Sequence, residues 1–301
     1  MTLMRIFTPL AAACLATLLV ATPAQAQSGE GVERDVGPRS QFADLVPAEQ
    51  VEGMAAQQYR QMLDQARAQH ALAPVSNGQL VRLREIAKRI IAQTPPWNPR
   101  ARNWQWDVNL LGSPQLNAFC MPGGKIAFYY GILEKLQLSD DEVAIVMGHE
   151  VAHALREHAR ERMAKEQYTR LGAGLVSAVL GLGYAGDAAV RMGGQLLTLK
   201  FSRHDESEAD LVGLELAARA GYNPQAGVTL WQKMMQAAKG APPQWLSTHP
   251  SSPTRIADIE AHLPEVMPLY ERADKPAQHF ELAPPLRKRS ASSATSAPAR
   301  P

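Results

Sequence analysis

Cysteine is scarce in this sequence, which contains only Cys14 and Cys120. If the first 26 residues are removed on export, Cys120 remains alone and no disulfide can form within the mature chain. A lone cysteine in the apolar context of Ala118 to Met121 is typical of a small buried side chain, and less so of a nucleophile. Stability is therefore expected to come from packing, with or without a bound metal.

Charge of one sign is not in excess either. The formal net charge is +2, so no overall electrostatic field favours nucleic acid or an acidic polymer, and no nucleic-acid partner is expected. After the first 26 residues the most hydrophobic portion is residues 171–184, which is too short to cross a bilayer. A buried helical hairpin within residues 171–199 is favoured over membrane contact, because glycine weakens a free-standing helix. The chain has no internal repeat.

The first 26 residues have the composition of an export signal. Arg5 precedes an apolar stretch from about Leu10 to Ala21, and Ala24-Gln25-Ala26 has the small-x-small form of a signal-peptidase site. The stretch is shorter than the roughly 20 residues that span a bilayer, which disfavours a retained anchor. Cys14 lies in a loose lipoprotein box, but the apolar residues continue beyond it, so lipid anchoring is also the weaker interpretation. We expect a cleaved signal peptide and a periplasmic protein.

Composition divides the rest of the chain into three parts. Residues 27–46 are rich in Gly, Ser, Pro and charge without apolar periodicity, and we expect an extended lead-in there. Residues 47–270 have the patterning of a folded domain. Residues 271–301 become rich in Pro, Ala, Ser and basic residues, which predicts a disordered tail, with binding to anionic lipid or a polyanion as the alternative.

The expected fold class is α+β and mostly helical. Apolar residues that recur every three or four positions predict helices over 48–69, 79–93, 196–220 and 223–238, with a short helix from Pro253 after a loop over 240–252. Aromatic and β-branched residues predict strands over 104–111, 116–121 and 126–130. Pro122-Gly123-Gly124 predicts a tight turn within this small sheet.

A further helix, beginning after Ser139, carries a metal-binding pattern. Ser139 and Glu142 have the spacing of a capping box. His149 and His153 are four residues apart, so both imidazoles leave the same helix face and can bind one ion. Zinc binds imidazole nitrogen well, and it keeps one position for water when the protein supplies three ligands in all. Glu150, beside that face, is the expected general base toward this water.

The third ligand must come from downstream residues. The candidates are His158, His204, Glu206, Glu208, Asp210 and His249. Glu206 is favoured because it shares a helix face with Asp210, so Glu206 can bind the metal while Asp210 steadies a ligand histidine. Glu208 is expected to point elsewhere. His204 remains an alternative ligand, and a merely acidic, solvated helix face remains the alternative to any site here.

Four motifs resemble the zinc endopeptidase family that contains the CAAX prenyl endopeptidases, the HtpX-type proteases and periplasmic BepA- and LoiP-like members. The motifs are residues 117–125 (NAFCMPGGK), 148–154 (GHEVAHA), 202–213 (SRHDESEADLVG) and 247–255 (STHPSSPTR). The resemblance covers about residues 40 to 265. It implies a zincin-type domain with a small sheet beside the HExxH helix and one zinc per chain. It also implies that Glu206 is the third ligand and that Asp210 contacts a ligand without binding the metal itself.

The same resemblance gives roles to three other parts of the chain. His249 becomes a candidate fourth metal ligand and reversible plug, where an ordinary surface histidine is the alternative. Arg255 becomes a candidate for neutralising a developing oxyanion, with a solvent-facing arginine as an equal alternative. Residues Asn117 to Met121 are expected to lie along the cleft as an edge strand that pairs with substrate, and a covered structural strand is the alternative.

Together these features predict a zinc-dependent endopeptidase that acts on misfolded or unassembled envelope proteins, with contact to the outer membrane or an assembly machinery as a further expectation. The lack of long apolar runs puts prenylated substrates in doubt. The alternative function is a chaperone-like quality-control factor whose peptidase activity is suppressed by His249. A purely structural zinc site would leave Glu150 without a role.

Overall fold

The computed structural model describes residues 30–179, 196, 200–239, 244–249 and 254–286. The predictions made for the signal peptide, for Cys14 and for residues 287–301 therefore lie outside the described residues. Within the described part, no helix combines the length and the apolar character needed to cross a membrane.

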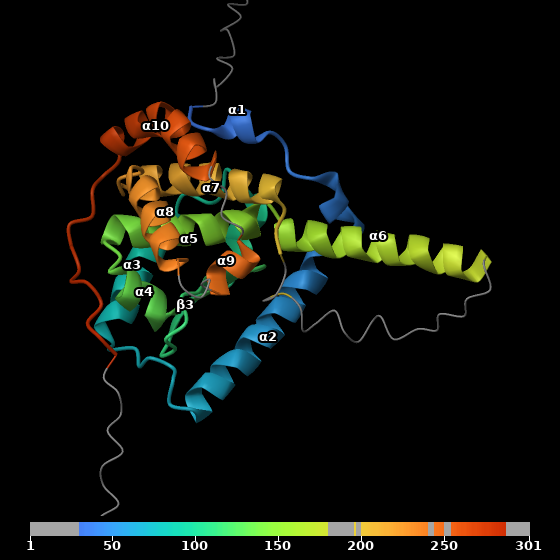
Figure 1. Ribbon diagram of the computed structural model, residues 1–301, viewed down its shortest axis with the longest axis horizontal. Coiled ribbons are helices and arrows are strands. Elements are labelled where there is room, and N and C mark those ends of the chain that lie inside the picture. The colour runs from blue at the N-terminus through green and yellow to red at the C-terminus, as the bar shows by residue number, and fades with distance from the viewer. Residues whose placement is uncertain (1–29, 180–195, 197–199, 240–243, 250–253, 287–301) are drawn as a thin grey trace, which may run out of the picture.

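The central element is helix α5 (Asp140–Leu155). Its start is fixed by the capping box, in which Ser139 Oγ accepts a hydrogen bond from the Glu142 amide and Glu142 Oε2 accepts one from the Ser139 amide. Every residue of α5 from Glu142 to Leu155 is buried. A helix that is buried on all sides must be covered on all sides. Figure 1 shows α5 in the middle of the molecule, with α7 (Arg203–Arg219) and α8 (Ala226–Ala237) packed beside it.

The contact between α5 and α7 depends on a pair of glycines. A Cβ atom at Gly148 would lie 2.6 Å from the carbonyl oxygen of Gly213, and one at Gly213 would lie 2.7 Å from the amide nitrogen of His149. Only glycine allows the two backbones to approach this closely. The crossing therefore brings the first turns of α7 next to the C-terminal half of α5.

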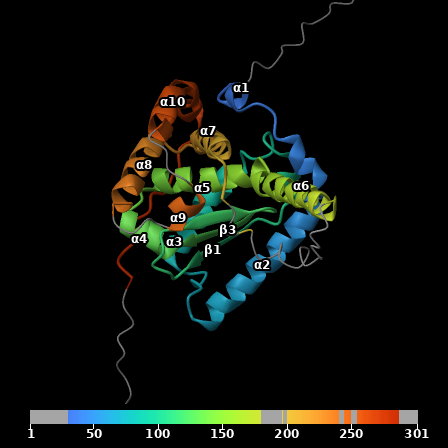
Figure 2. The ribbon, with the colours of Figure 1, turned by 45° about the vertical axis from the view of Figure 1, so that its right-hand side comes forward.

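A three-stranded sheet covers another face of α5. Its strands are β1 (Asp107–Leu111), β2 (Ala118–Met121) and β3 (Lys125–Tyr129), in the order β1-β3-β2. β1 is parallel to β3 and β2 is antiparallel to it. Among the described residues β2 is an edge strand, and it is also the strand that packs on α5. Helix α2 (Ala48–Ala68) covers the opposite face of the sheet, as Figure 2 shows.

The remaining elements surround this core. They are α1 (Glu33–Val36), η1 (Gln41–Leu45), α3 (Gly78–Ile91), η2 (Pro99–Asn103), α4 (Tyr130–Leu136), α6 (His158–Val179), α9 (Gln244–Thr248) and α10 (Thr254–Arg272). Helix α6 extends away from the body of the molecule in Figure 1. The predicted fold class, mostly helical with a small sheet beside the helix at 140–155, is confirmed.

Several predicted boundaries change. The helix predicted over 196–220 begins at Arg203, because Ser202 caps it by accepting a hydrogen bond from the Asp205 amide. The loop predicted over 240–252 contains α9. Helix α10 has 19 residues and is not short. Of the hairpin predicted within 171–199, the structure describes the end of α6, and residues 180–195 lie outside the described residues.

The segment predicted to be an extended lead-in and part of the tail predicted to be disordered both pack on the domain. In the lead-in, Val32 is buried, and its amide donates to Glu215 Oε2 at 2.9 Å. In the segment after α10, Ala283 is buried and the carbonyl of Pro284 accepts a hydrogen bond from Tyr130 at 2.7 Å. These contacts join residues far apart in the sequence, so local composition did not reveal them. The predicted domain boundaries themselves stay a prediction.

Candidate metal centre

Four buried side chains converge at one point of the fold. His149 and His153 come from α5, Glu206 comes from the first turn of α7, and His249 follows α9. One donor atom of each lies within 4.8 Å of the donor atoms of the others. The structure therefore brings together all four residues that the sequence nominated as metal ligands.

The distances within this cluster suit a tetrahedral cation. His149 Nε2 is 3.1 Å from His153 Nε2 and 3.2 Å from His249 Nδ1. The carboxylate oxygens of Glu206 lie 3.0 Å from His249 Nδ1 and 3.6 Å from both His149 Nε2 and His153 Nε2. Four ligands placed about 2.0 to 2.1 Å from a tetrahedral zinc are roughly 3.3 Å apart. Three ring nitrogens and a carboxylate that face one another at such separations fit zinc.

Asp210 orients the first of these ligands. Its Oδ1 lies 3.0 Å from His149 Nδ1. Burial alone would raise the pKa of Asp210, but Arg255 and His149 outweigh burial and lower the pKa to about 2. The carboxylate can then only accept, so His149 Nδ1 donates and His149 Nε2 presents its lone pair to the cluster.

Arg255 neutralises the carboxylates behind the cluster. Its Nε and Nη2 each donate to Asp210 at 2.6 Å, and its Nη1 donates to Glu206 Oε2 at 2.7 Å. The guanidinium lies over the ring of Trp231, 3.7 Å from its centroid. The residue is 3% exposed, which excludes the solvent-facing alternative. Burial disfavours the charged form, yet Asp210 and then Glu206 raise the pKa of Arg255.

Burial and neighbouring charge set the protonation of two ligands. Burial, reinforced by the adjacent imidazoles, holds the pKa of His153 well below its usual range, so this ring is neutral and can bind a metal. Burial would raise the pKa of Glu206, but His249 and the neighbouring cationic groups lower it. Glu206 therefore remains a carboxylate.

Glu150 is held by a residue that the sequence analysis missed. Trp245 Nε1 donates to Glu150 Oε1 at 2.6 Å, and the Trp245 side chain is completely buried. Its ring also stacks on His249, with 4.9 Å between the centroids. The signal was the spacing of Trp245 and His249, four residues apart, but the prediction of a loop over 240–252 hid it.

The other ligand candidates lie outside the cluster. His204 is 79% exposed at its side chain, so its position does not support the role of alternative ligand. Glu208 points away from the cluster, and it contacts His158 and Arg156 instead. His158 lies behind His153, on the side of the ring away from the other ligands.

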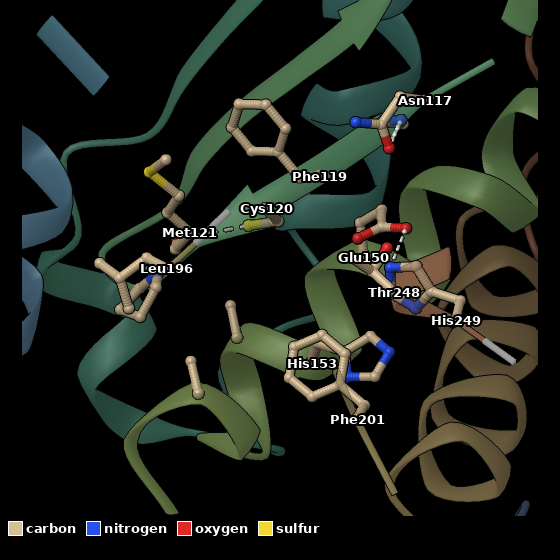
Figure 3. Close-up of a pocket in the computed structure, with 14 residues that line it drawn as sticks. Asn117, Phe119, Cys120, Met121, Glu150, His153, Leu196, Phe201, Thr248 and His249 are labelled. Atoms are coloured by element: carbon tan, nitrogen blue, oxygen red, sulfur yellow. Dashed lines mark hydrogen bonds and ion pairs between the residues drawn. The ribbon is translucent and has the colours of Figure 1, made fainter. Parts of the chain in front are cut away.

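A pocket opens beside the cluster, between α5 and the edge of the sheet. Residues Asn117 to Pro122 form one wall, and Glu150, His153, Phe201 and His249 form the other. Figure 3 shows β2 with Phe119, Cys120 and Met121 passing above His153 and Glu150. Burial raises the pKa of the Cys120 thiol well above its usual value, which suits a small buried side chain and not a nucleophile.

Comparison with known proteins identifies a family and several relatives. The family described as Peptidase family M48 matches residues 80–263. The mitochondrial metalloendopeptidase OMA1 of Schizosaccharomyces pombe is 36% identical over 200 residues, which are 63% of this chain and 54% of that protein. OMA1 of Arabidopsis thaliana is 40% identical over 150 residues, 50% of this chain and 30% of that protein.

A bacterial relative is more distant. The beta-barrel assembly-enhancing protease of Escherichia coli is 28% identical over 170 residues, 53% of this chain and 35% of that protein. The chain thus spans between about a third and about half of the length of these relatives.

The predicted periplasmic location is corrected by these relatives. The prediction rested on residues 1–26, which lie outside the described residues, and on resemblance to periplasmic proteins. The proteins from Schizosaccharomyces pombe, Arabidopsis thaliana and Saccharomyces cerevisiae are named mitochondrial instead. The motifs around the metal centre fix the chemistry of a site and carry no information on the compartment, so they could not support the location.

Proposed function

The chain belongs to peptidase family M48, and on that premise we propose that it is a zinc-dependent endopeptidase that cleaves unfolded or unassembled protein segments. The proposal is carried by one observation, the convergence of His149, His153 and Glu206 with Glu150 beside them. The relatives named metalloendopeptidases support it over the part of their length that this chain covers.

The donor set assigns the metal. His149, His153 and Glu206 would hold zinc, which suits two neutral imidazoles and a carboxylate. When bound, zinc polarises a substrate carbonyl and lowers the pKa of a water molecule. Asp210 holds His149 in the tautomer that binds, and Arg255 neutralises Asp210 and Glu206. Arg255 therefore acts on the ligands, and a direct role toward an oxyanion is not needed to explain its burial.

Glu150 supplies the general base. It follows His149 directly on α5, and its carboxylate faces the pocket wall formed by β2. A carboxylate at this place can take a proton from water on one side of the scissile amide and deliver it to the leaving nitrogen. His249 Nε2 lies 3.6 Å from Glu150 Oε1, so the base and the fourth ligand candidate occupy neighbouring positions.

The edge of β2 supplies the substrate site. Among the described residues, β2 pairs with β3 on one side and is the edge strand of the sheet. Just before β2, the carbonyl of Leu116 accepts a hydrogen bond from the backbone amide of Trp245. An edge strand offers backbone donors and acceptors to an extended peptide, so recognition depends little on side chains and favours unfolded segments. The Escherichia coli relative is named for enhancing assembly, and this name supports the proposal that the substrates are proteins in the course of assembly. It also supports the proposal that the protein contacts an assembly machinery.

A second function is favoured by the position of α9. His249 occupies the fourth ligand position of the cluster, and Trp245 holds the carboxylate of Glu150. In this arrangement both groups needed for hydrolysis are covered. The alternative is therefore a chaperone-like factor in which peptidase activity is normally suppressed by His249.

The zinc content and casein cleavage of three proteins test the proposal. Glu150→Gln should retain zinc and lose cleavage by about 10² to 10⁴-fold, because the amide cannot act as a base. His153→Ala should lose both zinc and cleavage. Equal cleavage by the wild type and both variants would refute metal-assisted hydrolysis. If Glu150→Gln preserves the cellular role of the protein, the chaperone-like alternative replaces the enzyme.

A further inference from the structure

Behind His153 lies a buried group of polar residues to which the proposed function gives no role. His158 is the first residue of α6, Glu208 lies on α7, and Arg156 is the C-terminal cap of α5. All three are buried. Buried charged groups are costly unless they are paired, so their presence next to a metal ligand calls for an explanation.

The group forms a continuous chain of hydrogen bonds. His153 Nδ1 is 2.8 Å from His158 Nδ1, and His158 Nε2 is 2.8 Å from Glu208 Oε2. Arg156 donates to both carboxylate oxygens of Glu208, at 3.0 and 3.3 Å. The chain thus runs from a metal ligand candidate through a second imidazole to a carboxylate that is paired with an arginine.

The local backbone makes this contact possible. Glu157, between α5 and α6, has a left-handed conformation with φ of 59°. A left-handed residue ends a helix, and here it separates α5 from α6 and gives His158 a position relative to His153 that a continuous helix would not allow. The ring of Phe201 stacks on the ring of His153, with 4.0 Å between their centroids.

The carboxylate at the end of this row of hydrogen bonds determines which nitrogen atoms donate and which accept. Glu208, paired with Arg156, is a carboxylate that only accepts, so His158 Nε2 donates to it. In a neutral imidazole the other nitrogen accepts, so His158 Nδ1 accepts from His153 Nδ1. His153 Nε2 is then without a proton, and it is the atom that faces His149 and Glu206. The opposite order would place a proton between His153 and the cation.

We propose that His158 and Glu208 are positioning residues that keep the proton of His153 on Nδ1 and so present its Nε2 to the metal. The inference rests on the proposed metal site. It gives the two ligand histidines equivalent support, because His149 reaches its carboxylate, Asp210, directly, whereas His153 reaches Glu208 through His158.

Two substitutions at His158 separate the two halves of its role. The Oδ1 of asparagine can occupy the place of imidazole Nδ1, so His158→Asn keeps the acceptor that faces His153. The amide nitrogen of glutamine can occupy the place of Nε2, so His158→Gln keeps the donor to Glu208 and lacks the acceptor. His158→Ala removes both. His204→Ala is the matched control, since His204 also approaches Glu208, at 3.8 Å, but its side chain is exposed and lies outside the metal cluster.

The measurement is the zinc affinity of the whole chain, by competition with a chromophoric chelator at fixed pH. His158→Ala and His158→Gln should bind zinc about 10 to 100-fold more weakly than the wild type, the loss typical when the partner of a metal-bound histidine is removed. His158→Asn should lie closer to the wild type, and His204→Ala should match it. The visible spectrum of the cobalt-loaded protein should shift in His158→Gln and less in His158→Asn.

Unfolding temperatures of the metal-free proteins show whether the variants fold alike. Wild-type affinity in His158→Gln, or equal losses in His158→Asn and His158→Gln, would overturn the inference while leaving the metal site intact. A wild-type chain that binds no zinc would refute the proposed function and this inference with it.

Discussion

The two sides of the metal centre are built in different ways. On one side, His149, His153 and Glu206 belong to α5 and α7, two long buried helices that cross at Gly148 and Gly213. On the other side, His249 follows α9, a helix of five residues. To remove His149, His153 or Glu206 from the centre, the core between α5 and α7 would have to open. To remove His249, only the small set of contacts made by α9 would have to break. We therefore expect the first side to be permanent and the second to be conditional, and we call them the permanent side and the conditional side of the centre.

The largest effect is expected from breaking the permanent side. Gly148→Ala places a Cβ 2.6 Å from the carbonyl oxygen of Gly213, a backbone atom that cannot move without separating α5 from α7. We expect the free energy of unfolding to fall by about 1 to 3 kcal/mol and zinc binding to weaken, because Glu206 moves with α7. Denaturant unfolding and zinc titration measure the two changes.

Gly53→Ala is the control for that substitution. Gly53 also lies inside a helix, α2, but a Cβ there meets nothing within 4 Å. We expect this variant to be unchanged or about 0.5 to 1 kcal/mol more stable, since alanine favours helix over glycine. Equal destabilisation in both variants would mean that the helix crossing does not depend on the glycine pair.

The sequence predicted the permanent side well. The four-residue spacings of His149 with His153 and of Glu206 with Asp210 are properties of a single helix, and any helix places such pairs on one face. The three strands and the capping box at Ser139 are local in the same sense. The family resemblance drawn from four motifs is confirmed by the match over residues 80–263.

The contacts that support His153 and Glu150 could not be predicted, because one depends on a break in local periodicity and the other joins distant parts of the sequence. In a continuous helix His153 and His158 would lie about 140° apart, so nothing in the spacing linked them. The left-handed conformation of Glu157 changes that relation, and no glycine marks its position. The bond from Trp245 to Glu150 joins residues 95 positions apart, which no local pattern records.

A substitution on the conditional side should have an intermediate effect, and it should raise the cleavage rate, whereas Gly148→Ala lowers stability and zinc binding. His249→Ala removes the fourth donor of the cluster and leaves His149, His153 and Glu206 in place. We expect casein cleavage to rise on the order of tenfold, which corresponds to a shift of about 1.4 kcal/mol toward the open state. Zinc content, measured in parallel, should stay at one per chain. An unchanged or lower rate would show that His249 does not plug the site.

The smallest effect is expected from Trp245, which lies on the conditional side together with His249. Trp245→Phe removes the indole N–H that Glu150 accepts at 2.6 Å but keeps an aromatic ring against His249. Because water can replace this hydrogen bond once α9 moves away, its loss should weaken the closed arrangement by about 0.5 to 1 kcal/mol, the lower part of the net range for a hydrogen bond. We therefore expect a rise in casein cleavage of a few-fold, smaller than that of His249→Ala.

Trp106→Phe supplies the matched control, because the Trp106 indole donates to the carbonyl of Ala101, away from the metal centre. Its cleavage rate should equal that of the wild type. A decrease in Trp245→Phe would mean that the tryptophan holds Glu150 in its working position. In that case α9 would belong to the active arrangement, and the distinction between a permanent and a conditional side would rest on His249 alone.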